Sequence, residues 1–270
     1  MADLFIFGLG YSAERITAAI RAAGGSVRAT GRSGDLSFGD AGAVRKALAA
    51  ASHVLSSVPP DRETDGDPVL GTYGEDLARF TARGGWLGYL SSTGVYGDAG
   101  GAWVDETAPV GTGRRTARAL CDLAWLERGA RVFRLPGIYG PGRSALDRVA
   151  QGRASRIDMP AQVFSRVHVE DIASGVLAAI TVQAPSGAYN FADDLPCSQN
   201  AVTEEACRIL GVDPPPLQTL EEAGLSPAAR GFYAENRRVA NGKARRVLGW
   251  TPRYSTFRDG LRALAAQESR

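Results

Sequence analysis

Short apolar runs alternate with segments of helical periodicity through the first half of the chain. The run at residues 4–7 is typical of a buried strand, and the periodic segment at 12–23 ends at Gly24-Gly25 as a helix would. The predicted strands cover 4–7, 26–30, 53–58, 86–91 and 130–135, and the predicted helices cover 12–23, 41–51, 69–83 and 114–128. This alternation predicts an α/β fold: a doubly wound parallel sheet covered by helices on both faces.

The second half of the chain is richer in helices and loops. Its helical patterns lie at 145–151, 169–180, 198–210, 241–248 and 256–266. The prolines at 214–216 impose an extended segment after the third of these helices. We expect this half to form a smaller lobe over the carboxyl edge of the sheet.

A glycine-rich turn joins the first predicted strand to the first predicted helix. It fits G-x-G-x-x-G/A, with Gly8, Gly10 and Ala13 at the three defined places and Tyr11 and Ser12 between them. In such a turn the first glycine permits the sharp bend, and the second lets the backbone approach a pyrophosphate. The small third residue lets helix pack on strand, and the helix N-terminus attracts the phosphates. The position within a β-α-β pattern favours dinucleotide binding over a purely structural turn.

The end of the second predicted strand bears on which dinucleotide binds. NAD sites usually place a carboxylate about 20 residues past the glycines. Here the strand runs into Arg32 and Ser33, and the first carboxylate is Asp35. Arg32 and Ser33 fit a 2′-phosphate, which favours NADP over NAD. The alternative is that Arg32 is a solvated surface residue.

Composition and charge exclude several other classes. The net charge of +2 gives no electrostatic footprint for nucleic acid. The three cysteines, Cys121, Cys197 and Cys207, show no metal-binding spacing and are expected to be free thiols. With two histidines and no HExxH pattern, we expect no metal site. The first residues carry no basic segment or long apolar run, so we expect a cytoplasmic protein without membrane contact.

Several motifs follow in an order that resembles a known family. The segment 90–97 reads LSSTGVYG, 134–143 reads RLPGIYGPGR, and 166–172 reads RVHVEDI. Segments 189–194 and 248–252 supply two later landmarks. These motifs resemble the extended short-chain dehydrogenase/reductases, the NAD(P)-dependent epimerase/dehydratase family. The short glycine turn is similar to that of its atypical branch.

The resemblance implies a Rossmann-like domain with a small C-terminal substrate-binding domain. We expect residues 1–137 and 166–192 to form the dinucleotide-binding domain, and 138–165 and 193–270 to form the substrate domain. The family acts at a hydroxyl or carbonyl carbon, often of a sugar or nucleotide sugar. A small-molecule substrate and a homodimer through the helices at 69–83 and 114–128 are further expectations from the resemblance.

The resemblance also implies a catalytic Ser/Thr and a Tyr-x-x-x-Lys pair. Ser92 falls at the Ser/Thr position, but none of the eight tyrosines has lysine four residues later. Arg114 falls where tyrosine is expected and Arg118 where lysine is expected. Arg118 could still bind a ribose hydroxyl or a phosphate, whereas Arg114 cannot donate a proton near neutral pH. The alternative for this helix is a solvated face with an Arg118–Asp122 ion pair.

Other residues could replace the missing acid. Tyr139 is a candidate because Arg143 follows four residues later, and Tyr96 is a second. His168 is expected to be structural, and a Ser92–His168–Asp171 triad is disfavoured because no G-x-S-x-G elbow exists. The predicted catalytic set is therefore Ser92, Arg118 and Tyr139.

Two functions remain open. One is an oxidoreductase or epimerase/dehydratase that uses NADP, with NAD less favoured. The other is a catalytically weakened protein that binds NADP as a sensor or interaction partner.

Overall fold

A computed structural model describes residues 2–268 of the chain. Six parallel strands form one sheet in the order β10–β6–β4–β3–β1–β2. Their bounds are β1 Asp3–Phe7, β2 Ser26–Ala29, β3 His53–Ser56, β4 Trp86–Ser92, β6 Arg131–Leu135 and β10 Gly187–Asn190. The predicted strands are all present, and β10 joins the edge beside β6. The prediction of a doubly wound parallel sheet is confirmed.

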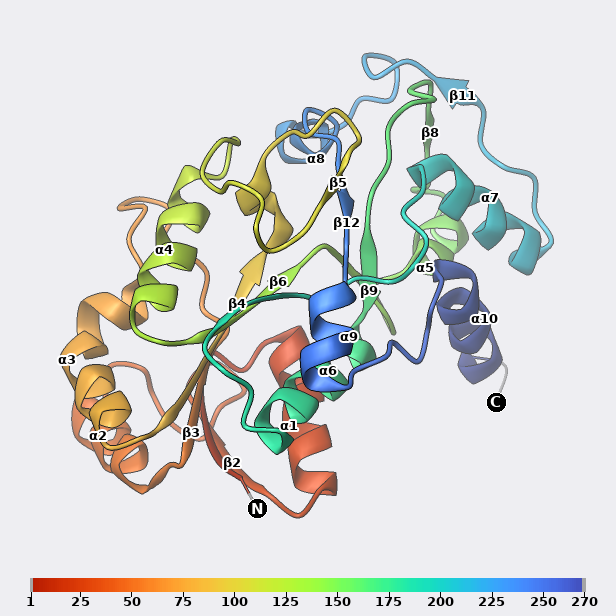
Figure 1. The fold of residues 1–270 in the computed structure, drawn as a ribbon. Coiled ribbons are helices and arrows are strands. Elements are labelled where there is room, and N and C mark those ends of the chain that lie inside the picture. The colour runs from red at the N-terminus through yellow and green to blue at the C-terminus, as the bar shows by residue number, and fades with distance from the viewer. Residues whose placement is uncertain (1, 269–270) are drawn as a thin grey trace.

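Helices cover both faces of this sheet (Figure 1). On one face α1 (Tyr11–Ala22), α6 (Val169–Thr181) and α9 (Gly242–Leu248) bury Ile16, Ile172 and Leu248 against the strands. On the other face the helices are α2 (Ala41–Ala50), α3 (Pro68–Ala82) and α4 (Thr116–Glu127). Two apolar cores thus sandwich the sheet, which fixes the carboxyl ends of its strands as one edge.

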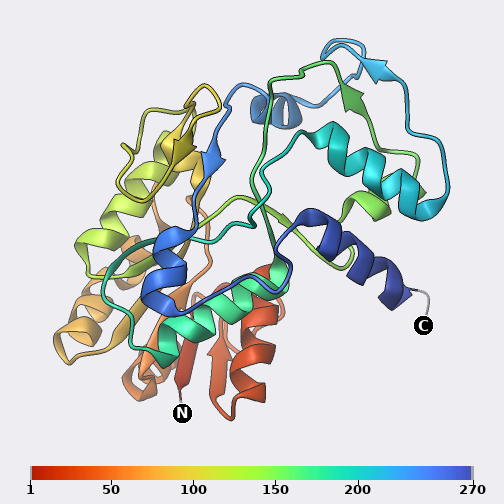
Figure 2. The same cartoon turned by 45° about the vertical axis from the view of Figure 1, so that its right-hand side comes forward.

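A second lobe stands over that edge (Figures 1 and 2). Its helices α5 (Ala145–Ala150), α7 (Gln199–Leu210) and α10 (Phe257–Glu268) enclose a separate small core that contains Leu146, Val202 and Leu261. The 3-10 helix η1 (Thr93–Tyr96) follows β4, and α8 (Pro227–Phe232) lies in the segment that returns over the edge. The lobes are therefore distinct in packing, although the chain passes between them repeatedly.

Three short strand pairs in the described part of the chain lie outside the main sheet and were not predicted. Each pair is parallel: β7 with β9, β8 with β11, and β5 with β12. Their bounds are β5 Trp103–Val104, β7 Gly137–Tyr139, β8 Arg156–Ile157, β9 Arg166–His168, β11 Leu217–Gln218 and β12 Arg238–Val239. Two or three residues carry too little apolar periodicity to be recognised from the sequence. Among the helices of residues 2–268, none has the length and apolar character needed to cross a bilayer.

Candidate active site

A hollow of about 750 Å³ opens at the carboxyl edge of the sheet, between the two lobes. It reaches Gly10 after β1 and Ser57 after β3. Since β2 and β3 flank β1 on opposite sides, the strand order reverses here. Open α/β sheets bind their ligands at such a reversal.

The glycine turn forms one side of this hollow. Gly8 has φ +84°, a backbone conformation that side chains rarely adopt. The Leu9 N–H donates to the carbonyl of Thr30 at 2.8 Å, which ties the turn to the end of β2. A Cβ added to Gly10 would meet no atom within 4 Å. The space beyond Gly10 is therefore open, and a ligand can approach the backbone there.

The N-terminus of α1 faces the same hollow. Gly10 caps the helix without any side-chain hydrogen bond, so the first amides of α1 keep their N–H groups free. Tyr11 and Ser12 line the hollow half-buried, and Ala13 is buried against the strands. The Tyr11 hydroxyl donates to the carbonyl of Pro141 at 3.1 Å. These residues lie together as the glycine spacing predicted.

Arg32 and Ser33 lie just beyond this turn and are exposed. Gly31 has φ +122°, and a Cβ on it would lie 2.9 Å from the Leu9 nitrogen, so the turn after β2 packs on the glycine turn. The nearby carboxylate of Asp35 is already engaged. Partial burial opposes its ionisation, but hydrogen bonds from the Ala29 N–H and the Arg28 side chain outweigh burial and lower its pKa.

Ser92 lies on the opposite side of the hollow, at the end of β4. Its hydroxyl oxygen accepts from the Gly94 N–H at 3.1 Å and caps η1. The side chain of Arg115 crosses Gly94 beside it: a Cβ on Gly94 would lie 2.6 Å from Arg115 Cδ and 3.3 Å from Ser92 Oγ. Arg115, which the sequence analysis missed, is thus a cationic neighbour of Ser92 in the hollow.

Arg114 and Arg118 also line the hollow, but in different ways. The helix begins at Thr116, later than predicted, so Arg114 precedes it. Arg114 is exposed, and its backbone N–H donates to Glu235 Oε1 at 3.0 Å. Arg118 donates from Nη1 to the Tyr89 hydroxyl at 2.8 Å. The alternative of an Arg118–Asp122 ion pair is wrong, because the Asp122 carboxylate binds another arginine.

That arginine is Arg134 of β6, the strand next to the edge strand β10. Its guanidinium donates to both carboxylate oxygens of Asp122, at 2.7 and 3.1 Å, and both side chains are almost fully buried. The Ser91 hydroxyl donates to the same carboxylate at 2.5 Å, and Arg134 also donates to the Tyr96 hydroxyl at 3.0 Å. This network fastens α4 to β4 and β6 directly beneath Ser92. An arginine inside a predicted buried strand was the sequence signal for it.

Tyr139 lies elsewhere. It lines a second hollow of about 380 Å³ and belongs to the core of the second lobe, against Gly260 of α10. Its hydroxyl has no hydrogen-bond partner among the described residues, and burial raises its pKa. The Arg143 guanidinium stacks 5.7 Å from the ring of Tyr11, and the expected Tyr139–Arg143 pairing is not formed. Tyr96 is likewise buried, with its hydroxyl bound to Arg134.

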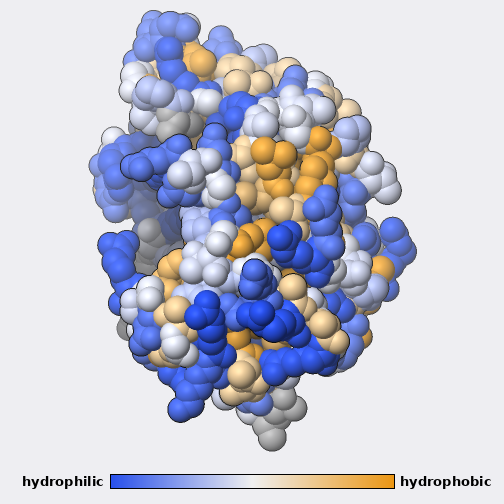
Figure 3. Space-filling model, turned by 90° about the vertical axis from the view of Figure 1, so that its left-hand side faces the viewer, coloured by the Kyte–Doolittle hydropathy of each residue, from blue (hydrophilic) through white to orange (hydrophobic). Residues whose placement is uncertain are grey.

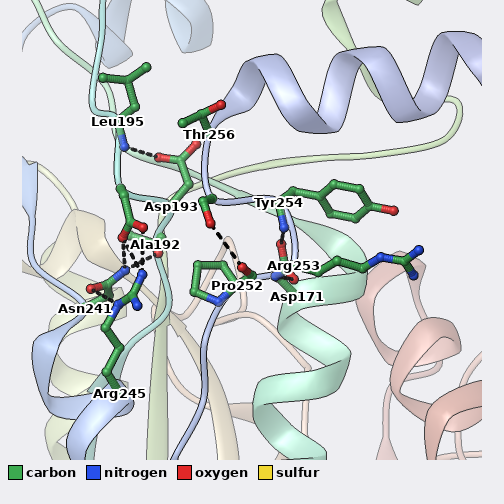
Figure 4. A network of polar contacts seen from close by, with 12 residues as sticks. Asp171, Ala192, Asp193, Leu195, Asn241, Arg245, Pro252, Arg253, Tyr254 and Thr256 are labelled. Atoms are coloured by element: carbon green, nitrogen blue, oxygen red, sulfur yellow. Dashed lines mark hydrogen bonds and ion pairs between the residues drawn. The ribbon is translucent and has the colours of Figure 1, made fainter.

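His168 and Asp171 have structural partners. The Nδ1 atom of His168 accepts from the Glu170 N–H at 3.2 Å and caps α6. Burial, together with Arg15 and Arg253, lowers the pKa of His168 to about 4. The Asp171 carboxylate accepts from the Arg253 and Tyr254 N–H groups at 2.6 and 3.1 Å (Figure 4). Neither side chain is hydrogen-bonded to Ser92, so no Ser–His–Asp relay forms.

Arginine dominates the charge of the main hollow. Among the described residues that line it, Glu235 is the one carboxylate. The arginines there are Arg114, Arg115, Arg118, Arg143, Arg148, Arg166 and Arg237. A concave surface with this surplus attracts anions. Arg237 also lies in the hollow and pairs with Glu235 at 3.0 Å.

Solved structures of other proteins share this fold. A protein of unknown function from Silicibacter pomeroyi has a solved structure with 37% sequence identity and a TM-score of 0.86, and the match covers 100% of both chains. The human epimerase family protein SDR39U1, solved with NADPH, has a TM-score of 0.73 at 16% identity and covers 97% of this chain and 99% of that one. The chain therefore has the Rossmann-like fold of the NAD(P)-dependent epimerases, dehydratases and short-chain dehydrogenases/reductases.

A curated relative matches part of the chain. The 3-diazoavenalumate denitrifying reductase of a Streptomyces species is 33% identical over 161 residues, which are 54% of this chain and 52% of that protein. The match therefore spans about half the length of that relative. No model of a known protein family matches the chain. The comparisons thus show a Rossmann-like fold, and the chemistry of the site is argued from the residues of this chain.

Proposed function

We propose that this protein binds NADP in the main hollow and acts as a reductase on a carbonyl or hydroxyl carbon of a small molecule. The observation that carries the proposal is the open space beyond Gly10, which the free amides of α1 face and which is continuous with Ser92. Backbone amides at a helix N-terminus are a general binding device for phosphates. A reacting group held at Ser92 would share the same hollow.

The residues present fit a pyridine dinucleotide. Gly10, Tyr11, Ser12 and Ala13 would hold the pyrophosphate, with Gly8 shaping the turn. Bound NADP would supply or accept a hydride. The preference for NADP over NAD is supported by Arg32 and Ser33, which are exposed and free to meet a 2′-phosphate, and by Asp35, whose carboxylate is engaged elsewhere.

Ser92 and Arg118 would handle the substrate oxygen. The Ser92 hydroxyl proton is available, because the oxygen only accepts from Gly94 within the chain. Arg118 keeps its charge at every physiological pH and can stabilise negative charge, but it cannot deliver a proton. Tyr139 is the third proposed catalytic residue, and its position in the other hollow gives this role no support. The proton for a reduced oxygen would then come from Ser92 or from water.

The reductase class is favoured by the relative whose name describes a reductase. The second candidate is a protein that binds NADP as a sensor or interaction partner, and the absence of Tyr-x-x-x-Lys favours it. A screen of carbonyl substrates, followed by NADPH consumption, separates the two. Turnover that falls in the Ser92→Ala variant supports the reductase, whereas NADPH binding without any turnover supports the sensor.

The nucleotide site itself is tested by titrating the protein with NADPH and NADH, followed by tryptophan fluorescence. Gly10→Asp should abolish binding, because the carboxylate enters the space of the pyrophosphate. The matched control is Gly71→Asp in α3, where a Cβ also meets no atom within 4 Å. Binding that survives Gly10→Asp, or that is lost equally in both variants, contradicts the assignment.

The homodimer is also proposed. Figure 3 views the side of the molecule that carries α2, α3 and α4, and shows apolar residues gathered among hydrophilic ones. Leu120 and Leu123 of α4 are 60% and 40% exposed, which is unusual for two leucines on one helix. Light scattering of the wild type and of Leu120→Glu tests this: a monomeric wild type contradicts the dimer. A cytoplasmic location stays part of the proposal and is testable by cell fractionation.

A further inference from the structure

The seven arginines of the main hollow differ in how many hydrogen bonds their guanidinium groups donate to the rest of the protein. Arg166 donates to the carbonyls of Phe164, Cys197 and Ser198. Arg237 donates to Glu235 and the Gly97 carbonyl, Arg118 donates to Tyr89, and Arg148 donates to the Arg153 carbonyl at 3.4 Å. These guanidinium groups serve the structure of the protein as well as the hollow.

Two arginines of the hollow have no such acceptor. Neither Arg115 nor Arg143 has a side-chain hydrogen bond or ion pair to the described residues. Both guanidinium groups instead lie over aromatic rings, Arg115 at 5.3 Å from Phe232 and Arg143 at 5.7 Å from Tyr11. Stacking covers one face of a guanidinium and leaves its N–H edge free for an anion. The hollow therefore holds two positive charges with unused donors.

The two free arginines face different parts of the hollow. Arg143 stacks on Tyr11, the first residue of α1, so it accompanies the phosphate-binding amides. Arg115 crosses Gly94 next to Ser92, and Phe232 of α8 covers it from the second lobe. Desolvation lowers the pKa of Arg115, and the charges of Arg114 and Arg118 lower it further. Among the described residues that line the hollow, Glu235 is the one carboxylate, and it already binds Arg237 and both the N–H and the guanidinium of Arg114.

We infer that Arg115 forms an anion subsite for the substrate, which carries a carboxylate or phosphate group next to the carbon that reacts. A fork of guanidinium N–H groups binds such a group in bidentate fashion. Because Arg115 and Ser92 adjoin, one substrate could meet both: its anionic group at Arg115 and its reacting oxygen at Ser92. This inference rests on the proposed function, since it takes Ser92 as the place where the reacting group is held.

Arg115 immediately follows Arg114, which stands at the family's tyrosine position. A phenol in this region would serve proton transfer, whereas a guanidinium serves charge recognition and holds its proton. An anion subsite at Arg115 therefore gives the positive charge at this end of the hollow a role. It predicts that neutral carbonyl compounds bind poorly and that their anionic counterparts bind well.

Isothermal titration with oxalate and with inorganic phosphate tests the subsite without any need for turnover. Both probes are titrated into the wild type, Arg115→Met, Arg115→Lys and the control Arg62→Met, with and without saturating NADPH. Arg62 is an exposed loop residue outside the hollow. Arg115→Met should weaken the preferred probe about tenfold or more, because it loses two charge-assisted hydrogen bonds. The affinity of Arg115→Lys should lie between those of the wild type and Arg115→Met, and the affinity of Arg62→Met should equal that of the wild type.

The outcomes are distinguishable. A preference for oxalate identifies a carboxylate substrate, and a preference for phosphate identifies a phosphorylated one. Failure of both probes to bind the wild type, or equal binding to the wild type and Arg115→Met, overturns the subsite. Loss of NADPH binding in Arg115→Met also overturns it, because the residue would then belong to the nucleotide site. If the wild type binds no NADPH but still binds oxalate through Arg115, the proposed function fails and the subsite stands. Circular dichroism of each variant verifies folding, and Arg115→Lys replaces Arg115→Met if the latter is unfolded.

Discussion

The two sides of the main hollow are built from different parts of the chain. The amide side, formed by Gly8, Gly10 and the first turn of α1, offers backbone N–H groups and open space. The arginine side, formed by Ser92, Arg115 and Arg118, offers side chains that lie on β4 and α4. The amide side thus offers backbone groups that every residue has, whereas the arginine side offers groups that only particular side chains have.

This difference decides which amino-acid substitutions each side can tolerate. Backbone recognition requires glycines at two places, and most other positions of the turn can vary. Side-chain recognition requires that long arginines be held in place, and here a buried ion pair holds the helix that carries them. The proposed dinucleotide fits the first kind of site, and the proposed anionic substrate fits the second.

Breaking the buried ion pair should have the largest effect and should damage the arginine side selectively. Arg134→Met leaves Asp122 as an uncompensated buried charge, which should lower the free energy of unfolding by about 3–5 kcal/mol. Urea denaturation measures it. The double variant Arg134→Met/Asp122→Leu is the control and should recover much of the loss, because no buried charge remains. A single variant as stable as the wild type would show that the pair does not fasten α4.

The stability of the region beside the arginine side should depend on pH. Asp193 donates its N–H to the carbonyl of Arg166 on the arginine-rich rim, and one of its carboxylate oxygens is buried without a partner. Burial raises the pKa of Asp193 to about 7, well above the usual value near 4. The folded state therefore holds a proton that the unfolded state releases, and stability falls as pH rises from about 4 to about 7.

Replacing this carboxylate should remove that slope. The stability of Asp193→Asn relative to the wild type should increase between pH 4 and pH 8 by on the order of 3 kcal/mol. His168, whose pKa is lowered to about 4, titrates in both proteins and cancels from the difference. Chemical denaturation at several pH values measures it, and a difference that does not change with pH refutes the shift.

A methyl group on Gly94 should disturb the arginine side of the hollow and leave the amide side intact. A Cβ there would lie 2.6 Å from Arg115 Cδ, so Gly94→Ala should push the arginine aside. Oxalate or phosphate binding should weaken about tenfold, while NADPH binding stays unchanged. Gly74→Ala in α3, where a Cβ meets nothing within 4 Å, is the matched control. Equal anion binding in both alanine variants would separate Arg115 from the subsite.

The smallest effect is expected from the exposed end of the amide side. Arg32→Met should weaken NADPH roughly three- to tenfold and leave NADH unchanged, because an exposed charge–phosphate contact is partly screened by solvent. Fluorescence titration of both nucleotides measures the ratio, with Arg62→Met as the control. A parallel loss of both nucleotides would mean that Arg32 supports the turn and does not select NADP.

The amino-acid sequence by itself determined five of the six strands of the sheet, most helices and the glycine turn that forms the amide side of the hollow. Each of these depends on local periodicity or on a short glycine spacing, so the information lies within a few consecutive residues. The sequence also placed Ser92 and Arg118 on the correct strand and helix. It did not resolve the short strand pairs, which have too few residues to form a pattern.

Only the tertiary structure decided how the long polar side chains are used. Arg118 binds Tyr89, Asp122 binds Arg134, Arg143 stacks on Tyr11, and Tyr139 lies in the second core. An arginine reaches several ångströms in many directions, so its partner depends on which distant segments are packed beside it. That is why Arg115, one residue from the position the motif indicated, became visible as the neighbour of Ser92 only when the fold brought α8 and η1 together around it.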